Sequence, residues 1–212
     1  MKLNRYICLG AFALLSVIFA GLLLAQDKPA KDAKPGKDAP AVNIEEMTKK
    51  WMAAATPGAA HKALDSQAGE WDLTTKMWTP GTAGPPTETK GTATTKWILG
   101  GRFLQSDVTG EMMGMPMTGL GITGYDNFKK KYVTYWIDSL GTAMYTAEGT
   151  ADAAGKVFTY HGKMDEPATG EKDKPVKFIH RVLTADKHVF EIHDVALGAN
   201  SKAMEMSYTR KK

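Results

Sequence analysis

The stretch GEWDLTTKMW, residues 69–78, is the point at which the hydrophobic pattern of the chain changes from helical spacing to alternation. Trp71, Leu73 and Met77 share one face of this segment, and polar residues stand on the other. Successive side chains of a strand point to opposite faces, so such alternation is typical of a strand with one face against a core. The segment therefore predicts the first strand of a sheet.

Nine further segments repeat this pattern up to the end of the sequence. They are rich in Thr, Val, Tyr, Phe and Trp, and clusters of Gly, Pro, Asn or Asp separate most of them. Short strands at regular spacing, with no helical run between them, favour an antiparallel sandwich or barrel. A meander of about ten strands would close around a small molecule, since eight already can. We therefore predict an all-β fold, an antiparallel meander β-barrel over residues 69–212, with strands in 69–78, 90–99, 102–113, 117–126, 131–140, 143–152, 156–164, 176–185, 188–197 and 202–211.

A short helical segment is predicted ahead of the barrel, over residues 43–68. Asn43 and Glu46 have the spacing of a capping box, which satisfies free N–H groups at the start of a helix. Apolar residues then recur at helical spacing as far as Trp51 and beyond. Pro57 ends this helix and can open a second, shorter one, because proline is accepted in a first helical turn.

The first 25 residues have the layout of a secretory signal peptide. Lys2 and Arg5 precede an uncharged apolar run, Tyr6 to Ala25, after which the first polar residues appear. The run also reaches membrane-spanning length, so an uncleaved N-terminal anchor is the alternative. Residues 26–42 are rich in Lys, Pro and Ala and are predicted to be a disordered linker. We expect an exported protein, periplasmic or extracellular, that meets a membrane only through an uncleaved N-terminal segment.

Charge and cysteine content exclude two classes of function. Loss of residues 1–25 would lower the formal charge from +4, by the two charges of Lys2 and Arg5, to +2. No basic stripe with interleaved aromatic residues remains, so nucleic acid is not an expected partner. The same cleavage removes Cys8, the only cysteine, and with it any disulfide or thiolate nucleophile. Core burial alone must then hold the domain together.

Gly69 and Trp71 open the predicted first strand, and Arg210 lies in the last one. A Gly-x-Trp at the first strand with a basic residue near the end resembles the closed-end signature of lipocalins and related calycin barrels. There a cation covers the tryptophan face at the base of the barrel, a contact worth about 0.5–2 kcal/mol. The resemblance implies that Gly69, Trp71 and Arg210 close one end of this barrel.

A more specific resemblance covers nearly the whole predicted domain. It rests on WMAAATPGAAHKAL (51–64), GEWD (69–72), TKGTATTKWILGGRFL (89–104), GEMMGMPMTGLGITGYDNFKKKYV (110–133) and MEMSYTR (204–210). In order and spacing these motifs resemble the domain-of-unknown-function 1579 family. That resemblance implies a bacterial, secreted, calycin-like protein, and it implies little about activity because the family has no established reaction. This chain departs from the family pattern in carrying four histidines in its last strands, His161, His180, His188 and His193.

Four methionines lie within residues 112–117, around a predicted turn at Gly114-Met115-Pro116. Methionine fills irregular space in cores, and it also lines the mouths of apolar pockets. Its thioether is a ligand for copper(I), a third interpretation of the run. We favour pocket architecture over a metal site, with Met113 and Met117 as lining candidates, and assign no metal-binding residues.

Histidines of the last strands can act together only if their side chains point to the same face of the sheet. His180 shares a face with Phe178 and Val182, whereas His188 shares one with Phe190 and Ile192. If the faces that carry His161, His180, Glu191 and His193 point inward together, these side chains line one cavity wall. They would then provide an acid–base pair or a ligand for a metal or haem iron. The competing interpretation is that each histidine is a surface or hydrogen-bonded strand residue.

The function we favour from the sequence is binding of a small, mainly apolar ligand inside the barrel. The candidate ligand-binding residues are Met113, Met117, Trp136, His180 and His193. An enzyme, either a hydrolase or an isomerase that uses the strand histidines and Glu191, is the first alternative. A haem- or metal-binding protein and a ligand-free scaffold are the others. The sequence assigns no cofactor, and whether the protein is an enzyme stays open.

Overall fold

The computed structural model describes residues 43–79, 84–198 and 201–212, and residues 44–212 belong to one compact unit. The predicted signal peptide or anchor, residues 1–25, and the predicted linker, residues 26–42, lie outside the described residues. Within the described part of the chain, no helix has both the length and the apolar character needed to cross a membrane.

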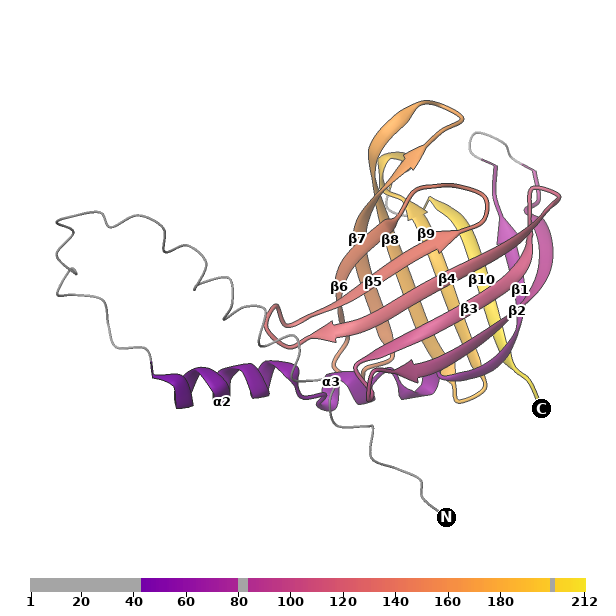
Figure 1. The fold of residues 1–212 in the computed structure, drawn as a ribbon. Coiled ribbons are helices and arrows are strands. Elements are labelled where there is room, and N and C mark those ends of the chain that lie inside the picture. Colours follow the sequence, from indigo (N-terminus) through magenta and orange to yellow (C-terminus); the bar gives the residue numbers. More distant parts are fainter. Residues whose placement is uncertain (1–42, 80–83, 199–200) are drawn as a thin grey trace, which may run out of the picture. The chain divides into compact units, whose positions relative to one another are not determined.

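Ten antiparallel strands form a closed barrel in the order β1-β10-β9-β8-β7-β6-β5-β4-β3-β2 (Figure 1). Consecutive strands pair throughout, and β1 also pairs with β10, which closes the meander. Closure leaves no sheet edge with free backbone groups. The predicted all-β meander barrel behind a short helical segment is confirmed. The strands are β1 Gly69–Met77, β2 Thr87–Ile98, β3 Phe103–Met112, β4 Met115–Asp126, β5 Lys131–Asp138, β6 Tyr145–Ala151, β7 Val157–Glu166, β8 Glu171–Thr184, β9 Lys187–Asp194 and β10 Lys202–Arg210.

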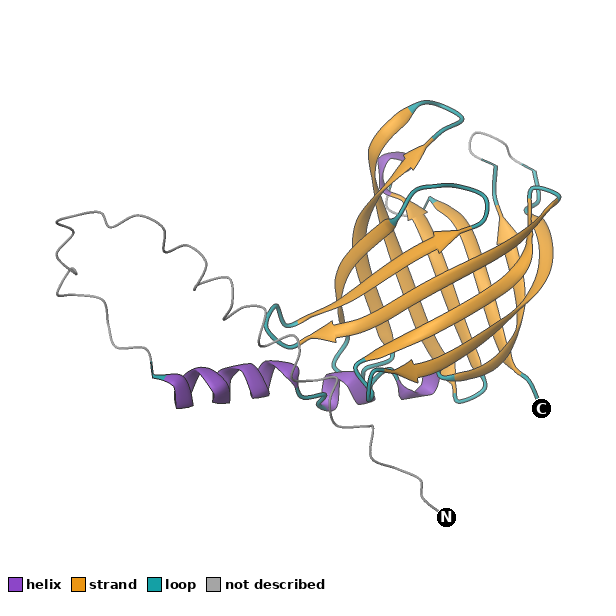
Figure 2. Ribbon diagram, viewed as in Figure 1, coloured by secondary structure: helices purple, strands orange, loops and turns teal. Residues whose placement is uncertain are grey.

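Short helical elements precede β1, and part of this segment lies across one end of the barrel (Figure 2). The elements are α2 Ile44–Ala55, α3 Ala59–Lys62 and the 3₁₀ turn η1 Asp65–Gln67; a second 3₁₀ turn, η2 Val195–Leu197, follows β9. Three barrel aromatics hold the segment through hydrogen bonds. Tyr132 Oη donates to the Ala60 carbonyl, Trp97 Nε1 to the Asp65 carboxylate, and Trp71 Nε1 to the Gln67 carbonyl. We call this end of the barrel the closed end.

Arg210 completes the closed end. Its guanidinium carbon lies 4.2 Å from the centroid of the Trp71 ring. The same group donates hydrogen bonds to three backbone carbonyls, those of Ser66, Ala68 and Ala185. Gly69 has a φ of +136°, and a Cβ there would overlap Nη1 of Arg210. The structure therefore brings Gly69, Trp71 and Arg210 together, with the cation over the indole face.

The inward face of the barrel follows from β1, where Trp71 and Leu73 are 1% and 3% exposed. Paired residues on adjacent strands lie on the same face of the sheet, so the strand register identifies the inward-facing residues of every other strand. Two apolar clusters result. One contains Leu64, Leu104, Tyr132, Ala147, Phe158, Tyr160, Val176 and Phe178. The other contains Trp71, Leu73, Ala93, Val108, Met117, Met204 and Met206, and the inward-facing Phe190 and Ile192 pack against both.

Gly69→Ala should lower the free energy of unfolding by about 3 kcal/mol, because the new methyl group both strains a left-handed backbone and displaces Arg210. Urea unfolding followed by tryptophan fluorescence measures the change. Gly141→Ala is the control: its backbone is unstrained and its Cβ would meet only Ala143 N, at 3.9 Å. That variant should stay within about 0.5 kcal/mol of the parent. Equal stability of the two variants would contradict the described role of Gly69.

Candidate functional site: the barrel interior

The methionine-rich run forms the β3–β4 hairpin. Met113 and Gly114 are the two turn residues, with φ of 53° and 75°, as a type I′ turn requires. Met113 sits at the tip and is 70% exposed, whereas Met117 is 6% exposed and packs with the cluster around Trp71. The structure therefore places Met117 in the interior and Met113 outside it.

Trp136 lies inside the barrel across the glycine-rich strand β4. It pairs with Gly121, and a Cβ added at Gly119 would overlap its six-membered ring. Its Nε1 donates to the Asp138 carboxylate at 2.8 Å. The glycines of β4 thus leave room for a large indole, which is the close approach that strand glycines commonly mark.

The histidines separate into two groups. His180 pairs with Phe158 and Phe190, and His188 pairs with Val182 and Tyr208, so both rings point inward. Their nitrogens are joined, His180 Nε2 to His188 Nδ1, at 3.2 Å.

The other residues predicted to line this cavity wall lie on the outer face of the barrel. They stand on the opposite face of their strands from the inward-facing Phe178 and Phe190. Glu191 there bonds Arg181, His193 and Lys202. His161 is also on the outer face. His180 therefore shares no wall with His161, Glu191 or His193, and His193 does not face the interior.

His188 and Tyr208 are interior residues that were not among the sequence candidates. The His180 ring stacks on Tyr208 with centroids 5.9 Å apart, and the His188 ring lies 4.5 Å from that of Trp71. A signal for His188 was present in the sequence. Its face of β9 carries Phe190 and Ile192, with an acid only at the strand end, Asp194, while the opposite face carries Glu191 in the middle of the strand. A mainly apolar face is the one that can be buried at low cost.

Burial keeps two histidines and two tyrosines of the interior neutral. It lowers the pKa of His180 to about 3, with a further decrease from neighbouring His188. Burial, helped by the charge of Arg210, lowers the pKa of His188 to about 4. Burial also raises the pKa of the Tyr160 and Tyr208 hydroxyls. At neutral pH the imidazoles of His180 and His188 and the phenols of Tyr160 and Tyr208 are therefore uncharged.

Several inward-facing side chains keep accessible surface inside the barrel. His180 and Tyr208 point inward, and each keeps an intermediate share of accessible surface. Trp136, Phe190 and Ile192 also point inward and keep such a share. Because these side chains point inward, their accessible surface borders space inside the barrel that neighbouring atoms do not fill, and we call this space the hollow. A separate small cavity, of about 10 Å³, lies between Leu73, Val108, Met117 and Met206.

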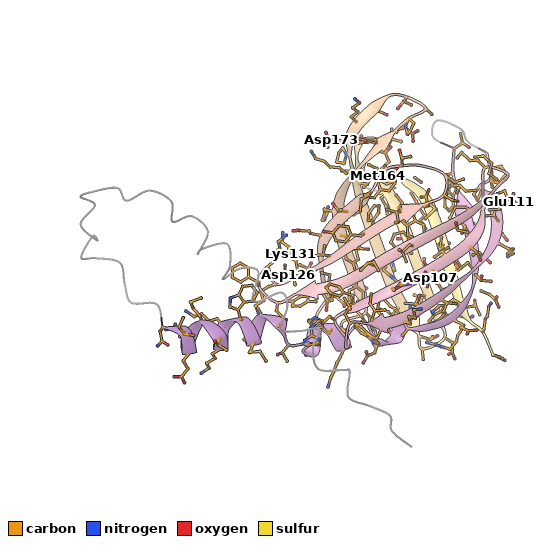
Figure 3. The ribbon with its side chains drawn as sticks, viewed as in Figure 1. Asp107, Glu111, Asp126, Lys131, Met164 and Asp173 are labelled. Carbon is orange, nitrogen blue, oxygen red and sulfur yellow. The ribbon has the colours of Figure 1, made fainter. Side chains whose placement is uncertain are left out.

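A larger depression of about 760 Å³ lies on the outer surface of β5, β6 and β7. Its charged groups already have partners: Lys131 pairs with Glu148, and Lys163 with Asp173. Lys131 and Asp173 lie well apart along the barrel, toward opposite ends (Figure 3). Within the described part of the chain, no group of three or more His, Cys, Asp or Glu side chains is placed to hold a metal ion.

Comparison with known proteins identifies relatives of the sequence and of the fold. The profile of a family described as "Protein of unknown function (DUF1579)" matches residues 56–210. The crystal structure of Rv2717c from M. tuberculosis superposes with a TM-score of 0.55 and 15% identity, over 74% of this chain and 100% of that one. At this identity the likeness shows the fold alone. A redesigned β-barrel covers the same shares at 11% identity and a TM-score of 0.38, too low to support an argument. No curated protein matches the chain.

Stability should fall as the pH is lowered from 8 to 5. The unfolded chain takes up protons on its histidines near pH 6.5, whereas folded His180 and His188 take them up only near pH 3 and 4. Their contribution is therefore complete above pH 6.5 and is lost as the pH falls, by about 2 kcal/mol for each residue at pH 5. Urea unfolding at each pH measures it. His180→Phe should reduce the loss by about 2 kcal/mol, and identical pH dependence in parent and variant would contradict the buried, neutral assignment.

Proposed function

The chain belongs to the DUF1579 family, a family of unknown function, and from the barrel itself we propose that it binds a small, mainly apolar ligand in the barrel interior. The observation that carries the proposal is the accessible surface kept by five inward-facing side chains, those of Trp136, His180, Phe190, Ile192 and Tyr208, which defines the hollow. An apolar enclosure with a few fixed polar groups is the usual composition of a small-molecule site.

The distribution of side chains supports entry of the ligand into the barrel from the end opposite the closed end. At the closed end the helical segment and Arg210 cover the interior. The opposite end carries loops, and Met77, Met112 and Met164 of the neighbouring strand ends are only partly buried there. The β7–β8 hairpin, which carries Met164 and Asp173, extends beyond the rest of the rim (Figure 3). Flexible thioether side chains at a rim adapt to ligands of different shape.

The alternatives keep different degrees of support. The hydrolase or isomerase alternative is weakened because Glu191 and His193 do not face the interior with His180. Only the His180–His188 pair is left there as a source of acid–base chemistry. A haem iron or a metal ion would find at most these two imidazoles among the interior histidines. A ligand-free scaffold would require the hollow to have no role. We also propose export, which the apolar run at Tyr6–Ala25 supports.

Filling the hollow should weaken ligand binding without unfolding the barrel. Ile192→Phe adds volume inside, so it should weaken binding of the neutral dye N-phenyl-1-naphthylamine about tenfold or more. Dye fluorescence titrated against protein measures the affinity. Ile137→Phe is the matched control, because Ile137 is on the outer face of β5 and 37% exposed. Its affinity should equal that of the parent.

Native mass spectrometry of the purified full chain complements this titration. Excess mass that disappears on denaturation would identify an occupant directly. Absence of both an occupant and dye binding in the parent would refute the proposal, and self-association of such a protein would favour the scaffold. Equal dye affinity in Ile192→Phe and Ile137→Phe would place any binding site outside the barrel.

A further inference from the structure

We propose that the interior site selects neutral apolar molecules that carry a hydroxyl group, such as alcohols and phenols, and that Nδ1 of His180 accepts the hydrogen bond from that hydroxyl. This inference rests on the proposed function and specifies its ligand class. It follows from the hydrogen-bond partners of the two interior histidines and from the charges that face the hollow.

The direction of the hydrogen bond between the two histidines can be assigned from their partners. His188 Nδ1 is occupied by His180, so Nε2 is the nitrogen left for its other neighbours. The Ser66 carbonyl interacts with the His188 ring and raises its pKa, as an acceptor of a ring N–H does. Nε2 is buried and makes no hydrogen bond to the described residues. The proton of neutral His188 therefore belongs on Nε2, toward Ser66.

This assignment determines the state of His180. With its proton on Nε2, His188 presents a lone pair at Nδ1, so His180 Nε2 must be the donor across the 3.2 Å contact. Neutral His180 has a single ring N–H proton, and this proton is on Nε2, where it is donated to His188. The Nδ1 of His180 is left with a lone pair, and no described residue donates to it. Such an acceptor in an apolar enclosure is the feature that a ligand hydroxyl or N–H satisfies.

The second hydrogen-bonding group beside His180 is the phenol of Tyr208, stacked at 5.9 Å between ring centroids. Its hydroxyl, like that of Tyr160, makes no hydrogen bond to the described residues and is not fully enclosed. A phenol both donates and accepts, as a ligand hydroxyl does. A hydroxyl-bearing ligand therefore matches both groups, whereas a pure hydrocarbon leaves the lone pair of His180 unpaired.

Charge argues against a carboxylate ligand. The inward-facing charged groups of the described strands are already engaged. Lys174 pairs with Asp194 at 2.6 Å, Asp138 accepts from Trp136, and Arg210 donates to backbone carbonyls at the closed end. A carboxylate would thus enter an apolar space with no described cation free to receive it, which is costly. The inferred ligand is therefore an alcohol or phenol and not a fatty acid.

The test compares three probes on the full chain: p-cresol and p-xylene, which have equal numbers of non-hydrogen atoms, and the slightly larger carboxylate p-toluate. Dissociation constants come from ligand-observed NMR titrations. The informative quantity is the ratio of the p-xylene constant to the p-cresol constant, because it cancels the shared apolar contribution. His180→Phe keeps an aromatic ring and removes the acceptor, so this ratio should fall about 3- to 10-fold. His161→Phe makes the same substitution on the outer face of β7 and should leave it unchanged.

The outcomes separate the two proposals. An unchanged ratio in His180→Phe, with p-xylene still bound, overturns the hydroxyl inference and leaves interior binding intact. Binding of p-toluate more tightly than p-cresol by the parent overturns it as well. No binding of any probe by the parent refutes interior binding, and the hydroxyl inference with it.

A measurement on the unaltered protein covers the case in which His180→Phe fails to fold. The ¹⁵N spectrum of histidine-labelled protein should show Nδ1 of His180 as unprotonated, and that signal should shift when p-cresol is added. A protonated Nδ1 would overturn the inference without any variant.

Discussion

The contact of Arg210 with Trp71 is the constraint on which the other features depend. Trp71 belongs to the first strand and Arg210 to the last, so the contact that covers the indole also joins the two ends of the meander. The guanidinium binds backbone carbonyls before β1 and after β8, which ties the helical segment to the barrel. Gly69 is needed at this point because a side chain there would occupy the space of the guanidinium.

The same cation influences the interior. Its charge acts on His188, whose neutral state it favours, and Arg210 and His188 both interact with the carbonyl of Ser66. His188 in turn bonds His180, which faces the hollow beside Tyr208. A single series of contacts thus runs from the closed end to the proposed ligand site. It makes the site neutral at its base, while Glu191 of β9 pairs with Arg181 and Lys202 on the outer face.

The strands could be predicted because alternation is a local property, visible in residues 69–78 without any knowledge of the fold. The faces of the last strands could not be fixed in the same way, since each strand has two faces and only the register decides which one is buried. His193 was therefore grouped with His180, although its face also carries Glu191 and packs against Lys202 outside. Met113 was expected near a pocket, but a turn with positive φ holds it at the hairpin tip.

The central claim is that the barrel encloses apolar space above its closed end. Crystals of the full chain pressurised with xenon test it most directly, because xenon occupies dry apolar cavities and its electron density is unmistakable. The account predicts a xenon site inside the barrel, in contact with Phe190 and Ile192. Xenon found only on the outer surface, with the interior filled by side chains, would contradict it.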